Sequence, residues 1–416
     1  MRGLTRPWAT AVVPVFLLTL LAAVPGSAAD AAEEAPVVWD LQWPDATLPH
    51  QGYPLLAGVE HVEVYHATPA TGMFSHHAHI TASGGVLLAF WSNHAVDEDA
   101  SGQRVLCSLS EDGREWATPF ECFPPMDEAR PAKHAGRVLT ANGWVVLDDR
   151  AFAVVEVDDK LDRGAPAADP RHSRGQAYKF RGNPPRRGWG RVAREVRADG
   201  SLGEIFWLVD DPPDPVEGFP AYPDLTDPRF TRVGLAINRT LAEPLHLPAW
   251  DFRHRTAWIQ AGDGHGMCEP TVYRRPDGVL VKLSRDLDRS RKIYAFLSHN
   301  DGYWWEPGIQ TNIPDSPSKA VAGTLPDGRI YLVGNQVAVK GRDPLVVSLS
   351  RDGIRFDQAA AIRSGAPPLR REGRAKTPGF QYPSAVVAQD ALWVIYSVGK
   401  EDVAVSRIPL SELPAK

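Results

Sequence analysis

Histidines gather in one short stretch near the start of the chain. Residues Phe74–Ile80 (FSHHAHI) are typical of a strand, and His94 ends the apolar run that follows. Because side chains alternate between the two faces of a strand, we expect His77 and His79 on one face. Such a pair can bind a metal ion, or one member can act as a general acid or base. The alternative is a cluster of surface histidines.

A second polar set is spread over the next hundred residues. His134 precedes a pair of expected strands, and Arg194 comes sixteen residues after Tyr178, with Arg191 close by. A histidine or a tyrosine can move a proton when its pKa suits the task, and an arginine binds a carboxylate through two parallel hydrogen bonds. The alternative is that Tyr178 is an ordinary buried hydroxyl and Arg194 an ordinary surface side chain.

Carboxylates and a cysteine supply further candidates. The run Asp97–Asp99 (DED) offers acids for hydrolysis, but nothing in the sequence pairs them and a solvated loop explains them equally. Arg253 lies in a basic stretch, and His265 with Cys268 has the spacing of half a zinc site. No second pair of ligands follows, so we expect no required cofactor and leave a calcium or zinc ion as an open alternative.

Two other cysteines lie on either side of one turn. Cys107 and Cys122 are placed almost symmetrically about Asp112-Gly113, so they can face each other across a hairpin. An exported protein permits a disulfide there, and two buried thiols are the alternative.

The elements that must hold all these residues are short strands. Apolar runs alternate with turn signals such as Asp-Gly, and prolines (37) and glycines (35) are frequent. No segment shows a long 3.6-residue period, so we expect little helix. The expected strands include Val86–Trp91, Trp144–Leu147, Phe152–Val157, Ile205–Val209, Val279–Leu283, Ile293–Leu297, Ile330–Val333, Leu345–Leu349 and Leu392–Ser397.

One eight-residue turn occurs three times, at 109–116 (LSEDGREW), 298–305 (SHNDGYWW) and 349–356 (LSRDGIRF). The last two copies end 51 residues apart, and the first two end 189 residues apart, about four steps of similar size. A repeat near 50 residues is the signature of a β-propeller. At that length, residues 61–416 predict one all-β domain of seven blades.

The N-terminus has the layout of a secretory signal peptide. Arg2 and Arg6 precede the apolar run Ala9–Val24, and small residues end the segment at Ala29. We therefore expect residues 1–29 to direct secretion, residues 30–60 to form a lead-in that closes the ring, and 61–416 to form the propeller. No other run is long enough to span a membrane, and a net charge of −6 without a basic stripe argues against nucleic acid. We expect a monomer.

The repeated turns resemble the Asp-box (BNR) motif, Ser-x-Asp-x-Gly-x-x-Trp, of sialidase-like β-propellers. Segments Met73–Trp116, Gly190–Leu208 and Tyr396–Ile408 also resemble secreted carbohydrate-active propellers, including ulvan lyases and L-rhamnose-α-1,4-D-glucuronate lyases. The resemblance covers most of the mature chain, segment by segment. It implies a polysaccharide lyase that cleaves a uronic-acid-containing oligosaccharide or polysaccharide by β-elimination.

In those lyases two histidines, a tyrosine and an arginine form the site. The arginine neutralises the carboxylate so that the C5 proton becomes acidic, and the tyrosine removes that proton and protonates the leaving O4. The resemblance assigns the catalytic roles to His94, His134, Tyr178 and Arg194. His77 and His79 remain alternatives to His94, and Arg191 is the alternative to Arg194. From their residue types we expect His77, His79, Arg191 and Arg253 to bind substrate, and we place any metal at His265 and Cys268.

Two other functions suit a propeller of this kind. A sialidase binds a carboxylate with three arginines and uses a Tyr/Glu nucleophile and an Asp acid, but the Phe/Tyr-Arg-Ile-Pro motif of that family is absent. Another glycoside hydrolase would use paired acids. A non-catalytic glycan-binding propeller would instead present exposed aromatic side chains, such as Trp189, Tyr222 and Trp304.

Overall fold

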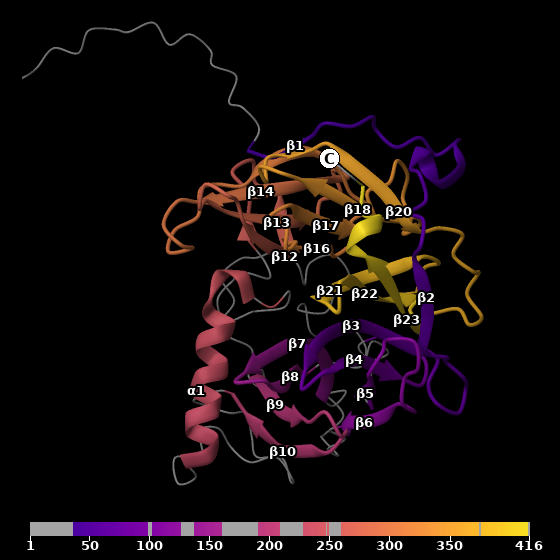
Figure 1. The fold of residues 1–416 in the computed structure, drawn as a ribbon, viewed down its shortest axis with the longest axis vertical. Helices are drawn as coiled ribbons and strands as arrows, with labels where there is room; N and C mark the ends of the chain where they lie inside the picture. The colour runs from indigo at the N-terminus through magenta and orange to yellow at the C-terminus, as the bar shows by residue number, and fades with distance from the viewer. Residues whose placement is uncertain are drawn as a thin grey trace, which may run out of the picture. The chain divides into compact units, whose positions relative to one another are not determined.

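The computed structural model describes residues 36–98, 102–125, 137–159, 190–208, 228–246, 248, 259–373 and 376–414. Their strands form small antiparallel sheets, and neighbours in a sheet are mostly neighbours in the sequence (Figure 1). This repetition is the architecture of a β-propeller, which confirms the predicted fold class. The described residues contain five sheets of four or five strands, so the predicted count of seven blades is not confirmed.

The sheets, in strand order, are as follows. The first sheet consists of β3 (Phe74–Ser83), β4 (Val86–His94), β5 (Arg104–Ser110) and β6 (Phe120–Phe123). The second consists of β7 (Arg137–Leu147), β8 (Arg150–Asp159), β9 (Gly190–Val196) and β10 (Leu202–Trp207). The third consists of β11 (Ile259–Gln260), β12 (Gly266–Arg274), β13 (Leu280–Asp286), β14 (Lys292–Ser298) and β15 (Ile309–Pro314). The fourth consists of β16 (Val321–Thr324), β17 (Ile330–Gly334), β18 (Leu345–Ser350) and β20 (Gln358–Arg363). The fifth consists of β21 (Phe380–Ala388), β22 (Ala391–Val398), β23 (Asp402–Pro409) and β2 (Glu60–Tyr65).

Segments from both ends of the described chain share the fifth sheet. β2 pairs with β23, so that Val62 lies opposite Val405. The residues before β2 run along the fourth sheet, where β1 (Val38–Trp39) pairs in parallel with β19 (Arg355–Phe356). Pairing the last sheet with an N-terminal strand covers an edge that would otherwise expose unpaired backbone groups.

The three repeated turns share one hydrogen-bond network. In the first, Ser110 Oγ accepts from Gly113 N at 2.8 Å, and Asp112 Oδ1 accepts from the backbone N–H of Arg114 at 2.8 Å. Ser350 and Asp352 repeat these contacts, and Ser298 with Asn300 does so in the middle copy. Each turn leaves the third long strand of its sheet, so the sequence repeat is a structural repeat.

Apolar cores lie between neighbouring sheets. Trp91 of the first sheet and Trp393 of the fifth, both fully buried, belong to one cluster. Phe90, on the opposite face of β4, belongs with Trp207 of the second sheet to another. The first sheet therefore buries both faces, which is why β4 is a near-continuous apolar run and not an alternating one.

One helix departs from the expectation of an all-strand chain. α1 (Pro228–Ala242) is amphipathic: Val233, Ile237 and Leu241 recur every four residues and pack on the core shared by the first and second sheets. Proline is favoured in the first turn because it lacks the N–H that a helix leaves unpaired there. The prediction that no segment has a helical period is wrong for this stretch. The other helices among the described residues are the short 3₁₀ segments η1 (Pro49–Gly52), η3 (Pro244–His246) and η4 (Leu410–Glu412).

Candidate functional site

A tyrosine and a glutamate from different sheets form a buried pair. The Tyr382 hydroxyl donates to Glu269 Oε1 at 2.5 Å, and the two residues are 5% and 2% exposed. Tyr382 lies on β21 and Glu269 on β12, 113 residues apart in the chain. Burial, together with the negative charge of Glu269, raises the pKa of the Tyr382 phenol well above its usual range.

Both residues sit at β-bulges. The register shifts between Gln381 and Ser384 in β21 and between Cys268 and Thr271 in β12, and φ is +55° at Tyr382 and +54° at Glu269. A third bulge, in β3, places His77 at φ +54°. Non-glycine residues avoid this conformation, so the backbone is strained at three positions on the first long strands of three sheets.

Two arginines complete the surroundings of the phenol. Arg285 Nη1 donates to Glu269 Oε2 at 2.7 Å and to the Tyr382 hydroxyl at 2.9 Å. The Arg342 guanidinium lies over the Tyr382 ring, 5.0 Å from its centroid. Burial would lower the pKa of Arg285, but Glu269 and its neighbours raise it well above the usual value, so this guanidinium stays charged.

Histidines and a second ion pair border the other side of the ring. The His76 and His77 rings lie 4.2 and 5.7 Å from the Tyr382 ring, between centroids. Glu98, on the turn after β4, lies 3.4 Å from His77 Nε2 and accepts from Lys400 Nζ at 2.7 Å. Five charged side chains, from five segments of the chain, therefore surround one tyrosine.

A buried acid and a buried amine lie near the Tyr382–Glu269 pair. Burial raises the pKa of Asp315 to about 7, against the opposing effect of Arg285. Burial likewise lowers the pKa of Lys319 to about 8, and its Nζ donates to the carbonyl of Pro383, next to Tyr382, at 3.1 Å. The site is thus a mixed field of positive and negative charge in a dry environment, where each charge has a large effect on its neighbours.

This arrangement can activate the phenol as a nucleophile. A carboxylate that accepts the phenolic hydrogen bond can take the proton as the oxygen attacks, so Tyr382 need not be ionised beforehand. Arg285 and Arg342 supply the positive charge that a carboxylate substrate requires. Neither Tyr382 nor Glu269 was among the residues that the sequence suggested. A signal was present: Glu269-Pro270 and Tyr382-Pro383 place proline inside strand-like runs, where it is confined to bulges or edges.

The structure describes only some of the residues that the sequence predicts for the site. His134, Tyr178 and Arg253 lie outside the described residues. His94 Nδ1 accepts from the backbone N–H groups of Val96 and Asp97, both at 3.2 Å. Arg194 donates to the carbonyls of Gly203 and Cys122 at 2.6 and 2.7 Å, contacts that join β9 to β10 and β6, and Arg191 is buried on β9.

The bulge in β3 separates the two histidines expected on one face. His77 faces Glu98 and Tyr382, whereas His79 packs on Phe90, with ring centroids 5.5 Å apart. The expectation that alternation brings them together is wrong, because an extra residue resets the alternation.

The cysteines are all buried thiols. Cys107 and Cys122 do face each other, and their side chains form a hydrogen bond. Burial and this hydrogen bond raise the pKa of the Cys107 thiol. Cys268 is buried beside Glu269, and burial raises its pKa. His265 lies instead beside Asp286, 3.1 Å away, and Asp288, so the group of close ligand atoms there does not include Cys268.

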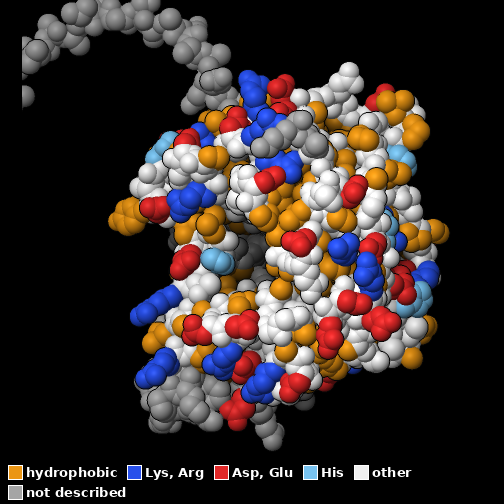
Figure 2. Space-filling view, viewed as in Figure 1, with side chains coloured by type: hydrophobic (Ala, Val, Ile, Leu, Met, Phe, Trp, Pro, Cys, Tyr) orange, Lys and Arg blue, Asp and Glu red, His pale blue; other side chains and the backbone are white. Residues whose placement is uncertain are grey.

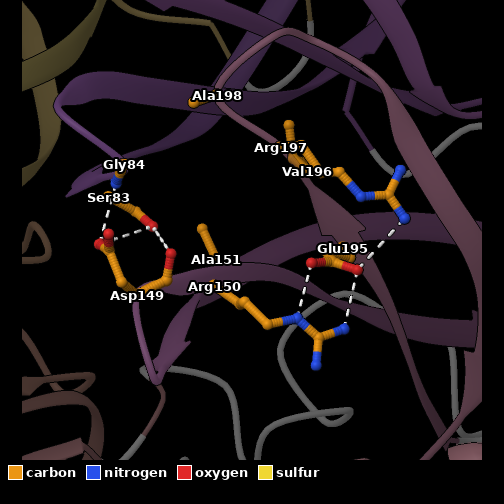
Figure 3. Close-up of a pocket in the computed structure, with 9 residues that line it drawn as sticks. All are labelled: Ser83, Gly84, Asp149, Arg150, Ala151, Glu195, Val196, Arg197 and Ala198. Carbon is orange, nitrogen blue, oxygen red and sulfur yellow. Dashed lines mark hydrogen bonds and ion pairs between the residues drawn. The ribbon is translucent and has the colours of Figure 1, made fainter.

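A separate pocket of about 210 Å³ lies at the far end of β3, near Ser83 (Figure 3). Its charged groups neutralise one another: Arg150 makes a two-pronged ion pair with Glu195 at 2.7 and 2.9 Å, and Arg197 reaches the same carboxylate. Over the face drawn in Figure 2, basic and acidic side chains are interspersed. Among the described helices, none is both long and apolar enough to cross a membrane.

Comparisons with known proteins match this architecture. A family model described as BNR repeat-like domain matches residues 238–395, and one described as BT_1020-like, N-terminal beta propeller matches residues 42–256. No curated protein matches the chain.

Several solved structures are similar. A sialidase is 23% identical with a TM-score of 0.69 over 90% of this chain, which spans 35% of that protein's length. Hadza microbial sialidase Hz136 is 12% identical with a TM-score of 0.55, covering 85% of this chain and 69% of that one. The Trypanosoma rangeli sialidase in complex with sialic acid is 14% identical with a TM-score of 0.51, covering 86% and 60%.

These likenesses establish the fold and confirm the predicted sialidase-like propeller with BNR repeats. One family model matches more than half of the chain. The chain therefore belongs to the BT_1020-like N-terminal β-propeller family.

Proposed function

We propose that this protein is a glycoside hydrolase that removes an acidic sugar from a glycan. The observation that carries the proposal is the hydrogen bond between Tyr382 and Glu269, with Arg285 bound to both. The likeness to sialidases supports a substrate whose carboxylate lies at or next to the anomeric carbon.

The chemistry explains why a tyrosine would serve there. An acidic sugar repels a carboxylate nucleophile, whereas a neutral phenol that loses its proton only during attack does not. Tyr382 Oη would form a bond to the anomeric carbon while its proton passes to Glu269 and the glycosidic C–O bond breaks. The leaving oxygen takes a proton from an acid. Water, deprotonated in turn, then hydrolyses the glycosyl-tyrosine and regenerates the phenol.

We assign the acid to the Asp97-Glu98 turn. Glu98 already contacts Lys400 and His77, so Asp97, the neighbouring carboxyl of this turn, is our choice for the proton donor. Arg285 and Arg342 would hold the substrate carboxylate, as planar guanidinium groups do best.

Uronate elimination is the second candidate, because two histidines, a tyrosine and arginines do meet at Tyr382. The direction of the tyrosine pKa favours the hydrolase. An elimination base must lose its proton easily, so its pKa should be lowered, whereas that of Tyr382 is raised. Glu269 beside the phenol would help a hydrolase, because this carboxylate can accept the phenolic proton during attack. It would hinder a lyase, because its negative charge adds to burial in raising the pKa of the phenol.

The test compares two products with one enzyme. Purified protein is incubated with fluorogenic ketosides of sialic acid and other 2-keto acids, and with uronate polysaccharides such as ulvan, while released acidic sugar and absorbance near 235 nm are followed. We expect release without absorbance, and a loss of at least about 10³-fold in Tyr382→Phe. A rise at 235 nm would instead establish the lyase.

The matched control is Tyr273→Phe. Tyr273 is equally buried, on the same strand as Glu269, and its hydroxyl donates to the carbonyl of Gly353. This variant should keep its activity. Equal losses in both variants would point to general loss of structure and contradict the assignment of Tyr382.

A further inference from the structure

Beside Tyr382, three potential metal ligands converge. His76, His77 and Glu98 each offer one ligand atom, and these atoms all lie within 4.8 Å of one another. His76 is fully buried and His77 is 5% exposed. The two histidines are consecutive in sequence, and only the bulge in β3 allows both rings to approach the same space.

The hydrogen bonds of His76 fix which nitrogen carries the proton. His76 Nδ1 lies 2.8 Å from Ser397 Oγ, and that hydroxyl donates its one proton to the carbonyl of Gln381 at 3.3 Å. In this arrangement Nδ1 is the N–H donor, and Nε2 keeps its lone pair. His76 Nε2 is buried and has no hydrogen-bond partner among the residues that the structure describes. A buried lone pair without a donor is costly unless something electropositive occupies the space in front of it.

The other two ligands have the spacing of a coordination edge. His77 Nε2 and Glu98 Oε1 are 3.4 Å apart, too long for a good hydrogen bond. Two ligands bound to zinc at about 2.0–2.1 Å in tetrahedral geometry are separated by about 3.3 Å. Lys400 holds the second oxygen of Glu98 at 2.7 Å, which orients the carboxylate as an outer-shell partner does.

We propose that His76 Nε2, His77 and Glu98 bind one divalent transition-metal ion of the zinc class. Two imidazoles and one carboxylate are the donor set that zinc takes when a fourth position stays open to water or substrate. The His76 and His77 rings lie 4.2 and 5.7 Å from the Tyr382 ring, between centroids, so the proposed ligands border the tyrosine. If the proposed hydrolysis is correct, the ion supplies a third positive centre for the substrate carboxylate, beside Arg285 and Arg342.

The test measures metal binding and not activity. The protein is stripped with a chelator, dialysed, and titrated with Zn²⁺ by calorimetry and with Co²⁺ by visible absorbance between about 500 and 650 nm, where low-symmetry Co²⁺ absorbs. We expect one equivalent in the wild type. His76→Ala should lose it, and Glu98→Gln should weaken binding at least about tenfold while preserving the side-chain shape. Lys400→Gln should weaken it about 10- to 100-fold.

The chain offers two matched controls. Among the described residues, His265→Ala removes a partly buried histidine–carboxylate group formed with Asp286 and Asp288. His66→Ala removes an exposed group formed with Glu63 and Asp402. Neither control variant should change the binding of the one Zn²⁺ ion expected in the wild type. Absence of that equivalent, or its loss in a control but not in Glu98→Gln, would overturn the proposal. Tyr382→Phe should bind the ion normally, so a failed metal site and a failed hydrolase assignment can be told apart.

Discussion

At the scale of single residues, the site depends on charged and polar groups that are buried together. Glu269, Arg285 and Tyr382 satisfy one another through three contacts of 2.5 to 2.9 Å, and each would be costly to bury alone. Removing one member of a buried ion pair leaves the other uncompensated, which costs about 3–5 kcal/mol, whereas replacing both is often nearly neutral.

Glu269→Gln should therefore lower the free energy of unfolding by about 3 kcal/mol, because Arg285 loses its counter-charge. The double variant Glu269→Gln/Arg285→Met should recover most of that loss. Urea unfolding of the wild type, both single variants and the double variant gives the coupling energy. Strictly additive losses would show that the three residues do not act as a unit.

At the scale of elements, the turns lock neighbouring sheets together. Gly113 adopts φ +73°, and a Cβ there would lie 2.0 Å from the Trp393 ring of another sheet. The turn therefore needs glycine twice, once for its backbone conformation and once for the close approach of the indole.

Gly113→Ala should be markedly destabilising, by more than about 2 kcal/mol, since strain and overpacking add. Gly278→Ala is the matched control. Gly278 has φ +92° but nothing within 4 Å of the added Cβ, so only the conformational cost of about 1–2 kcal/mol remains. Thermal unfolding of both variants measures the difference, and equal losses would mean that contact with Trp393 is unimportant.

At the scale of the whole molecule, stability should depend on pH through Asp315. Its pKa is about 7 in the folded chain, against about 3.8 when it is exposed, because burial disfavours the charge. Between these values the folded state holds a proton that the unfolded state has released, so this group lowers stability as pH rises from about 4 to 7. Three pKa units correspond to about 4 kcal/mol.

Asp315→Asn removes that ionisation. The melting temperature of the variant, relative to that of the wild type, should rise from pH 5 to pH 8, so that the difference is largest at pH 8. The exposed Asp357→Asn serves as the control and should show no such trend. A constant difference between Asp315→Asn and the wild type across this range would exclude Asp315 as the titrating group.

Local signals in the sequence were sufficient for the fold. The Asp-Gly turns predicted the repeat because Ser110, Asp112 and Gly113 bond to one another within four residues, without help from the rest of the chain. The apolar runs predicted strands for the same reason, and all nine expected strands are present in whole or in large part. Helix α1 was missed because polar residues and a glycine interrupt its short apolar stripe.

The site was decided by tertiary structure. Tyr382 and Glu269 are 113 residues apart, and His76 and Glu98 join them from the first sheet, so no local pattern connects them. Bulges in β3, β12 and β21 then turn His77, Glu269 and Tyr382 to positions that strict alternation would deny them. By itself the sequence determined a propeller with Asp-box turns, because those features depend on neighbours in the chain. Only the closed arrangement of sheets decided which charges meet, because that depends on register and on contacts between sheets.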